Sequence, residues 1–217
     1  MQQSYREIVI LKPTSVFLSF LAAQGPEVEL PSLTLLQADT TAYTIEKQDG
    51  EEETLDEIER HFPAMFRHEI NRWLGGKARN PIEGSFLDFL CCFKFEMHSQ
   101  VVVMEPSVEH GRALLCIKPR SVLLKWIKSS IEEQEDPYEV MESVTLTQLS
   151  ENATVVIKSF ESQLEIQSLL EHHFQAMFNA EMLRMCDRRE HWPDVDSCAE
   201  FNQYFAVEIH TKLVHLF

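Results

Sequence analysis

The sequence contains few basic residues. Its 217 residues include 19 lysines and arginines against 35 aspartates and glutamates, which gives a formal net charge of −16. A surface this acidic repels phosphate backbones and anionic lipid headgroups. We therefore expect no direct binding of nucleic acid or of a membrane surface.

Long apolar runs and paired cysteines are also lacking. No apolar run approaches the roughly 18–20 residues of a membrane span, and the first residues lead into a strand-like run without a signal-peptide layout. The five cysteines contain no Cys-x-x-Cys pair, which argues against a disulfide framework or a zinc ribbon. With 44% hydrophobic and 25% charged residues, the composition excludes a collagen-like or disordered chain. We expect a cytoplasmic protein with reduced cysteines.

Two segments of the chain recur. Leu11–Leu18 returns as Ile117–Leu124 at an offset of 106, and Glu59–Phe66 returns as Glu171–Phe178 at an offset of 112. Between residues 59–72 and 171–184, eight of fourteen positions are identical. A repeat of this length is typical of a duplicated domain rather than of a solenoid.

The duplication predicts the domain organisation. We expect a first α+β repeat over residues 1–105, a linker over 106–111 that contains proline and glycine, and a second α+β repeat over 112–217. Two such halves would pack about a pseudo-twofold axis, as the subunits of a homodimer do.

The periodicities predict a β-α-β-α-α-β module in each half. The continuous apolar runs Ile8–Leu11 and Ala113–Ile117 indicate buried strands. Further strands are expected at Thr41–Glu46, Ala153–Lys158, Lys94–Met104 and Ala206–Leu216. The segments 32–38 and 143–149 fit either a helical turn or a strand. One helix connects the first and second strands of each module, which favours parallel pairing of those two strands. Two helices connect the second and third strands, which favours antiparallel pairing. We therefore expect mixed sheets covered by helices.

The longest predicted helix runs from Leu55 to Leu74. Its apolar stripe begins at Leu55 and Ile58 and continues to Trp73. Pro63 lies inside this pattern and is expected to kink or restart the helix, because proline has no amide proton. Gln175 takes its place in the second half, so the fold does not require a break there.

Short motifs, some in both halves and some in one, form a recognisable pattern. They are Lys12-Pro13, Lys118-Pro119 with Trp126, His61-Phe62 with Glu69, His173-Phe174 with Glu181, Trp192-Pro193, Phe201, Tyr204-Phe205, Glu96-x-His98 and Glu208-x-His210. In these motifs each half resembles a family of short, uncharacterised bacterial proteins of about one module each. The first half departs from that pattern at Phe20 and at Asn80-Pro81, where the tryptophan is missing. The resemblance implies no activity and no cofactor.

Repeated histidines and glutamates suggest a metal site. On a strand, residues i and i+2 share a face, so each Glu-x-His pair presents a carboxylate and an imidazole together. Two histidines and a carboxylate can hold a metal ion, and the candidates are His61, Glu96 and His98, with His173, Glu208 and His210 in the second half. The alternative is that these histidines are buried and hydrogen-bonded, or form polar pairs across strands.

Two acidic clusters suggest a surface for a basic partner. One contains Asp49, Glu51, Glu52 and Glu53, and the other contains Glu132, Glu133, Glu135 and Asp136. Carboxylates in the first turn of a helix also stabilise its dipole, and a solvated face is the simpler interpretation of the rest. Electrostatic capture of a basic protein is the functional alternative.

The sequence favours a protein-interaction or adaptor module over an enzyme. It contains no Gly-x-Ser-x-Gly or His-Glu-x-x-His motif. We expect a protein partner that binds the acidic surfaces, and a chain that is a monomer or a homodimer. The alternatives are a metal-binding protein or metal-dependent enzyme, and a structural subunit of a larger assembly.

Overall fold

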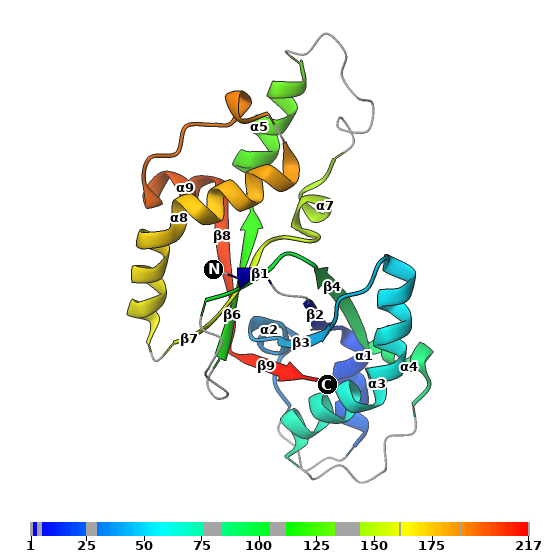
Figure 1. Cartoon of the computed structure of the whole chain (residues 1–217). Coiled ribbons are helices and arrows are strands. Elements are labelled where there is room, and N and C mark those ends of the chain that lie inside the picture. Colours follow the sequence, from blue (N-terminus) through cyan, green and yellow to red (C-terminus); the bar gives the residue numbers. More distant parts are fainter. Residues whose placement is uncertain are drawn as a thin grey trace. The chain divides into compact units, whose positions relative to one another are not determined.

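The chain divides into two compact units, each with its own sheet and helices (Figure 1). The N-unit contains Ser4–Ser99 and His210–Phe217, and the C-unit contains Met1–Gln3 and Gln100–Ile209. The structure is a computed structural model that describes residues 2–3, 6–24, 30–75, 84–104, 112–132, 144–160, 162–186 and 188–216.

Within the described residues, the N-unit contains a four-stranded sheet with the strand order β4-β2-β3-β9. Strand β2 (Arg6–Pro13) is antiparallel to both β3 (Thr41–Glu46) and β4 (Phe93–His98). Strand β9 (Lys212–His215) pairs in parallel with β3. Residues 8–11 of β2 are buried on both faces of the sheet, which confirms the prediction from their continuous apolar run.

Helices pack against one face of this sheet and form a core rich in phenylalanine. They are α1 (Ser15–Ala23), α2 (Leu33–Ala38), α3 (Glu51–Leu74) and α4 (Phe86–Cys92). Phe17, Phe66, Phe89 and Phe93 are each at most 2% exposed, and they pack with Val9 and other sheet residues in one cluster. Ring centroids such as those of Phe17 and Phe93 lie 4.5 Å apart, within the range of favourable aromatic pairs.

The C-unit contains a five-stranded sheet with the order β1-β5-β7-β6-β8. The strands are β1 (Gln2–Gln3), β5 (Val101–Val103), β7 (Val155–Ser159), β6 (Arg112–Pro119) and β8 (Phe205–His210). Strand β1 is antiparallel to β5, β5 is parallel to β7, and β7 is antiparallel to β6.

The helices of the C-unit follow the order seen in the N-unit. In the part of this unit that the structure describes, they are α5 (Ser121–Glu132), α7 (Leu146–Ser150), α8 (Gln163–Met185), a 3-10 helix η1 (Arg189–His191) and α9 (Cys198–Tyr204). Phe178, Phe201 and Phe205 lie in the buried cluster with residues of β6 and β7. Trp192, which the first half lacks, packs edge-on against Phe178 at 6.1 Å between ring centroids.

The predicted α+β class with mixed sheets is confirmed. The segments that fitted either a helical turn or a strand form α2 and α7. This extra helix makes the helix count between the first two strands even, so β2 pairs with β3 in an antiparallel manner and the predicted parallel pairing is wrong. Both units share one element order, while a duplication as its origin stays a prediction.

The last predicted strand of each half is in fact two strands. Residues 99–100 interrupt the first one, and β4 then ends in the N-unit sheet while β5 joins the C-unit sheet. Thr211 likewise separates β8 from β9. The compact units therefore differ from the predicted ranges 1–105 and 112–217, because β5 and β9 each pair with a strand from the other half of the sequence. The predicted linker 106–111 lies outside the described residues.

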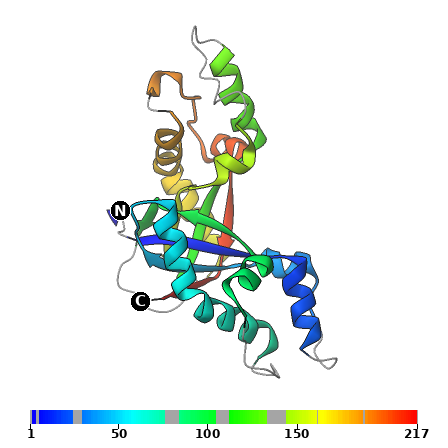
Figure 2. The ribbon, with the colours of Figure 1, turned by 90° about the vertical axis from the view of Figure 1, so that its right-hand side faces the viewer.

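The long helices are continuous but change direction along their length. Helix α3 contains Pro63 without an interruption, and Figures 1 and 2 show its two ends running in different directions. Helix α8 also bends, although Gln175 stands at the equivalent position. The bend therefore belongs to both units and does not depend on proline. Among the described residues, no helix is long and apolar enough to cross a membrane.

Candidate functional site

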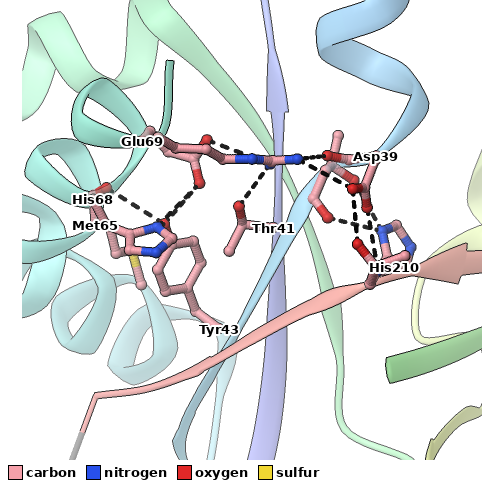
Figure 3. A network of polar contacts seen from close by, with 10 residues as sticks. Asp39, Thr41, Tyr43, Met65, His68, Glu69 and His210 are labelled. Atoms are coloured by element: carbon pink, nitrogen blue, oxygen red, sulfur yellow. Dashed lines mark hydrogen bonds and ion pairs between the residues drawn. The ribbon is translucent and has the colours of Figure 1, made fainter. Parts of the chain in front are cut away.

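The most extensive polar network of the N-unit surrounds a buried carboxylate on α3. Glu69 follows Met65 and Phe66 on the inward stripe of α3 and is only 1% exposed. The hydroxyl of Tyr43, on β3, donates to Glu69 Oε1 at 2.8 Å. His68 Nδ1 lies 2.9 Å from the same hydroxyl and 3.7 Å from Glu69 Oε1. Figure 3 shows the three side chains pointing toward one another.

The charge states of this network follow from its burial and its hydrogen bonds. Burial alone would raise the pKa of Glu69, but hydrogen bonds from His68, Thr41 and Tyr43 and the charge of Arg72 outweigh it and lower the pKa. Burial raises the pKa of Tyr43, and the neighbouring charge of Glu69 raises it further. At neutral pH, Glu69 is therefore ionised and Tyr43 is a protonated hydrogen-bond donor.

Arg72 links this carboxylate to the turn that precedes β3. Its guanidinium lies 3.9 Å from Glu69 Oε2 and donates to Thr41 Oγ1 at 2.9 Å. It also donates to the carbonyl of Asp39 at 2.5 Å and approaches the Asp39 carboxylate at 3.3 Å. The planar guanidinium suits this role because its donors diverge in fixed directions.

Asp39 carries the network on to β9, as Figure 3 shows on the side of His210. Its carboxylate accepts from the amide of Thr211 at 3.1 Å and from the Thr211 hydroxyl at 2.8 Å. His210 Nδ1 lies 3.0 Å from Thr40 Oγ1 and 3.2 Å from the Thr40 carbonyl. A carbonyl only accepts, so Nδ1 carries the proton. These bonds fasten the start of β9 to the turn before β3.

The C-unit repeats the centre of this network. Glu181 is buried and accepts from the backbone amide of Thr154 and from Arg184, whose Nη2 lies at 2.8 Å. Arg184 also donates to the carbonyls of Glu151 at 3.1 Å and Leu149 at 2.7 Å. Glu151 stands at the position equivalent to Asp39. The Glu-x-x-Arg pair thus anchors the same turn in both units, which identifies it as an element of the fold.

The geometry assigns this network a positioning role rather than a catalytic one. Glu69 is out of reach of solvent, and its carboxylate is occupied by Tyr43, His68 and Arg72. Tyr43 is fully buried and stays protonated. What the network does is to hold α3, the turn before β3 and strand β9 together.

The structure brings two of the three residues expected to bind a metal in the N-unit close together, Glu96 and His98, while His61 bonds to a residue of its own helix. His61 Nε2 lies 2.9 Å from Glu57 Oε1 on its own helix. Glu96 accepts from Lys12 Nζ at 2.6 Å, and the fully buried His98 lies 3.7 Å from Glu96 Oε2. The polar pairs across strands named as the alternative are therefore present at Lys12 and Glu96.

The candidate metal residues of the second half, His173, Glu208 and His210, also have other surroundings than a metal site. Glu208 lies 3.9 Å from Lys118 Nζ, repeating the Lys12–Glu96 pair. His173 is half-buried on α8, and His210 contacts Thr40. In the part of the chain that the structure describes, no group of three or more His, Cys, Asp or Glu side chains could hold a metal ion.

The first acidic cluster lies at the start of α3. Asp49 is exposed just before the helix, and Glu51, Glu52 and Glu53 are exposed in its first turn. The N-cap residue, Gly50, supplies no side-chain hydrogen bond, so these carboxylates complement the helix dipole in place of a cap. In the second cluster, only the backbone of Glu132 is described, and Glu133, Glu135 and Asp136 lie outside the described residues.

The acidic surface continues beyond the first turn of α3. Glu52, Leu55, Asp56 and Glu59 are all exposed, and their spacing of i, i+3, i+4 and i+7 places them on one face of the helix. We call this set the acidic face. Leu55 is 42% exposed within it. Its predicted place on the apolar stripe is wrong, because Thr54, Glu57 and Ile58 are the buried residues of this turn.

Sequence reasoning missed Tyr43, His68 and Asp39. A usable signal was the recurrence of Glu69-x-x-Arg72 as Glu181-x-x-Arg184, since residues three apart lie on one helix face. Nothing in the local pattern around Tyr43 indicates that its hydroxyl meets Glu69.

None of the known protein families, curated proteins and solved structures with which the chain was compared matches it. The resemblance to short bacterial proteins therefore stays a prediction.

Proposed function

We propose that this protein is an interaction module that binds a basic protein partner through the acidic face of α3. The observation that supports the proposal is three exposed carboxylates, of Glu52, Asp56 and Glu59, arranged around the exposed Leu55. Such a surface attracts a basic partner from a distance and offers an apolar contact at its centre.

The fold itself does not need this charge. At the equivalent positions of α8, 112 residues later, stand Leu164, Gln167, Ser168 and Glu171, which are all exposed. That face of α8 carries one carboxylate, and it is exposed to solvent like the acidic face of α3. The helix dipole explains Glu51, Glu52 and Glu53, but its effect falls off after the first turn. Asp56 and Glu59 lie beyond that turn and have no such role.

The overall charge fits the same proposal. A net charge of −16 accelerates association with a cationic surface and disfavours nucleic acid as a direct partner. No disulfide joins the five cysteines, all of which lie in the described ranges. A reduced state of this kind suits the cytoplasm, which is the location that we propose.

The proposal is tested by capturing partners with matched variants. Asp56→Asn/Glu59→Gln removes two carboxylates from the acidic face and leaves the first turn of α3 intact. The control, Glu171→Gln/Asp194→Asn, removes two exposed carboxylates from the C-unit. Wild type and both variants are incubated with native lysate, washed at low and high salt, and the retained proteins are quantified by mass spectrometry.

We expect basic proteins that the wild type and the control retain, that the acidic-face variant loses, and that high salt elutes. Retention of the same proteins by all three chains would refute the role of the acidic face. Circular dichroism checks that both variants keep their helices.

A further inference from the structure

The C-unit contains two buried polar atoms on the two residues that bond to Glu181. Within the described residues, Thr154 Oγ1 and Arg184 Nε are buried and have no hydrogen-bond partner. Thr154 is only 1% exposed, so bulk solvent does not reach its hydroxyl. A buried polar atom without a partner is costly, and such atoms in folded proteins generally bond to the protein or to ordered water.

Strand pairing identifies the residue of the N-unit that is equivalent to this threonine. Val9 on β2 lies opposite Tyr43 on β3. The residue 106 positions after Val9 is Leu115 on β6, and it lies opposite Val156 on β7. The residues two positions before Tyr43 and Val156 are both threonines. They therefore occupy equivalent places, at the start of β3 and just before β7.

These two threonines differ in their bonds to the arginine of the network. In the N-unit, Arg72 donates to Thr41 Oγ1 at 2.9 Å, as Figure 3 shows at Thr41. In the C-unit, Arg184 Nη2 lies 2.8 Å from Glu181 Oε2, and the amide of Thr154 donates to Glu181 Oε1. Thr154 and Arg184 thus bond to the same carboxylate, but the Thr154 hydroxyl does not bond to the guanidinium.

We propose that a buried water molecule bridges Thr154 Oγ1 and Arg184 Nε, in place of the direct hydrogen bond of the N-unit. The water accepts from Arg184 Nε and donates one proton to Thr154 Oγ1, and the Glu181 carboxylate accepts its second proton. Buried water molecules make about three hydrogen bonds of this kind, and such a bridge is nearly as favourable in enthalpy as a direct bond. The inference goes beyond the proposed function and does not depend on the acidic face.

Two smaller side chains in the C-unit provide room for this water. Val156 stands at the place of Tyr43. Ala180 precedes the buried glutamate of α8 as His68 precedes Glu69 on α3. A water molecule takes about 30 Å³ of volume, which is less than the phenol ring or the imidazole ring that these differences remove. Both rings contact Glu69 in the N-unit, so the water supplies a polar contact where the C-unit has apolar side chains.

The first measurement is a crystal structure of the full chain at a resolution that shows ordered water. We expect one water molecule within about 2.7–3.2 Å of both Thr154 Oγ1 and Arg184 Nε. At the equivalent place of the N-unit, we expect the direct bond between Arg72 and Thr41 and no bridging water.

The second measurement is amide hydrogen exchange of β7 in the variant Thr154→Val, which keeps the shape of the side chain and removes the hydroxyl. If the hydroxyl bonds to a water, its loss is expected to accelerate exchange at Val155–Ser159 about fivefold, as for one lost hydrogen bond. The control Thr147→Val changes an exposed threonine of the same unit and is expected to leave this exchange within about twofold of the wild type.

A crystal structure in which the Thr154 hydroxyl bonds directly to Glu181 or Arg184, without a water, would overturn the inference. Exchange that is unchanged or slower in Thr154→Val would also overturn it, because removing a buried hydroxyl that has no partner leaves stability unchanged or raises it. Neither result affects the proposed partner surface, which the lysate experiment tests separately.

Discussion

Replacing Arg72 by alanine is expected to destabilise the N-unit by about 3–5 kcal/mol, the usual cost of breaking a buried ion pair by removing one partner. The Arg72 side chain is 8% exposed and donates to Thr41 and Asp39. Its removal leaves the ionised Glu69 in the interior without a counter-charge. At the observed separation of 3.9 Å, the attraction between unit charges is about 4 kcal/mol at an effective dielectric constant of about 20.

The assay is urea unfolding followed by amide hydrogen exchange, since peptides from α3 and β3 report on the N-unit separately. Arg67→Ala is the control, because Arg67 lies on the same helix but is exposed. We expect the control to change the free energy of unfolding by less than about 0.5 kcal/mol. Arg72→Lys keeps the charge without the planar fork and is expected to fall between the two. A loss below about 1 kcal/mol in Arg72→Ala would refute the buried pair as an anchor.

The pH dependence provides an independent check of the same pair. In the folded chain the pKa of Glu69 is lowered from 4.5, so its charge stabilises the fold above that pH. This contribution is lost as the pH falls through the folded pKa. Arg72→Ala removes one cause of the lowered pKa. The difference in stability between wild type and variant is therefore expected to shrink as the pH falls below about 4.5, and a constant difference would contradict the charge argument.

Three further predictions concern the same unit. Because the pKa of Tyr43 is raised above 10.0, the wild type loses stability as the pH rises beyond that value, and thermal unfolding between about pH 9 and pH 11 should show a smaller loss in Tyr43→Phe. Phe89→Ala is expected to cost about 3–5 kcal/mol in urea unfolding, whereas Leu87→Ala, at a residue 72% exposed, should change it by less than about 0.5 kcal/mol. Ser85→Ala removes one half of the capping box with Asp88 and is expected to cost about 1 kcal/mol, measured as faster amide exchange in α4; an unchanged exchange rate would contradict the cap.

Local patterns predicted the elements better than their pairing. The apolar runs of β2 and β6 are buried, and the long helices lie close to the predicted ranges, because these features depend on periodicity within a few turns. The same periodicity predicts Leu55 on the apolar stripe, but its side chain is exposed. Its neighbour Thr54 is buried instead, and Thr54 Oγ1 donates to Glu7 at 3.0 Å. A polar residue with a partner in the core is invisible to a hydrophobic pattern.

The place of β9 could not be predicted from the sequence. Residues 206–216 read as one strand, and nothing in them shows that Thr211 ends the pairing with one sheet and that Lys212 begins it with another. Which edge a short apolar strand occupies depends on which edges the rest of the chain leaves open, and that is a property of the complete fold. The hydrogen bond from Thr211 to Asp39, which helps to hold the start of β9, joins residues 172 positions apart, so no local sequence pattern could predict it.

The candidate metal residues show that a repeated polar residue allows more than one interpretation. His61 and Glu96 recur as His173 and Glu208, and a repeated polar residue invites a chemical role. In the structure, Glu96 pairs with Lys12 as Glu208 pairs with Lys118, and His61 contacts Glu57 one turn earlier on its own helix. Cross-strand and helical neighbours explain these contacts without a ligand.

Comparing equivalent positions of the two units distinguishes residues that the fold requires from residues that it does not require. Glu69 with Arg72 and Glu181 with Arg184 are buried pairs that hold the same turn, so their recurrence follows from the architecture. Asp56 and Glu59 face solvent, and their counterparts Ser168 and Glu171 show that the helix tolerates a less acidic face. The charge of Asp56 and Glu59, which the architecture does not require, is therefore the observation on which the proposed partner surface depends.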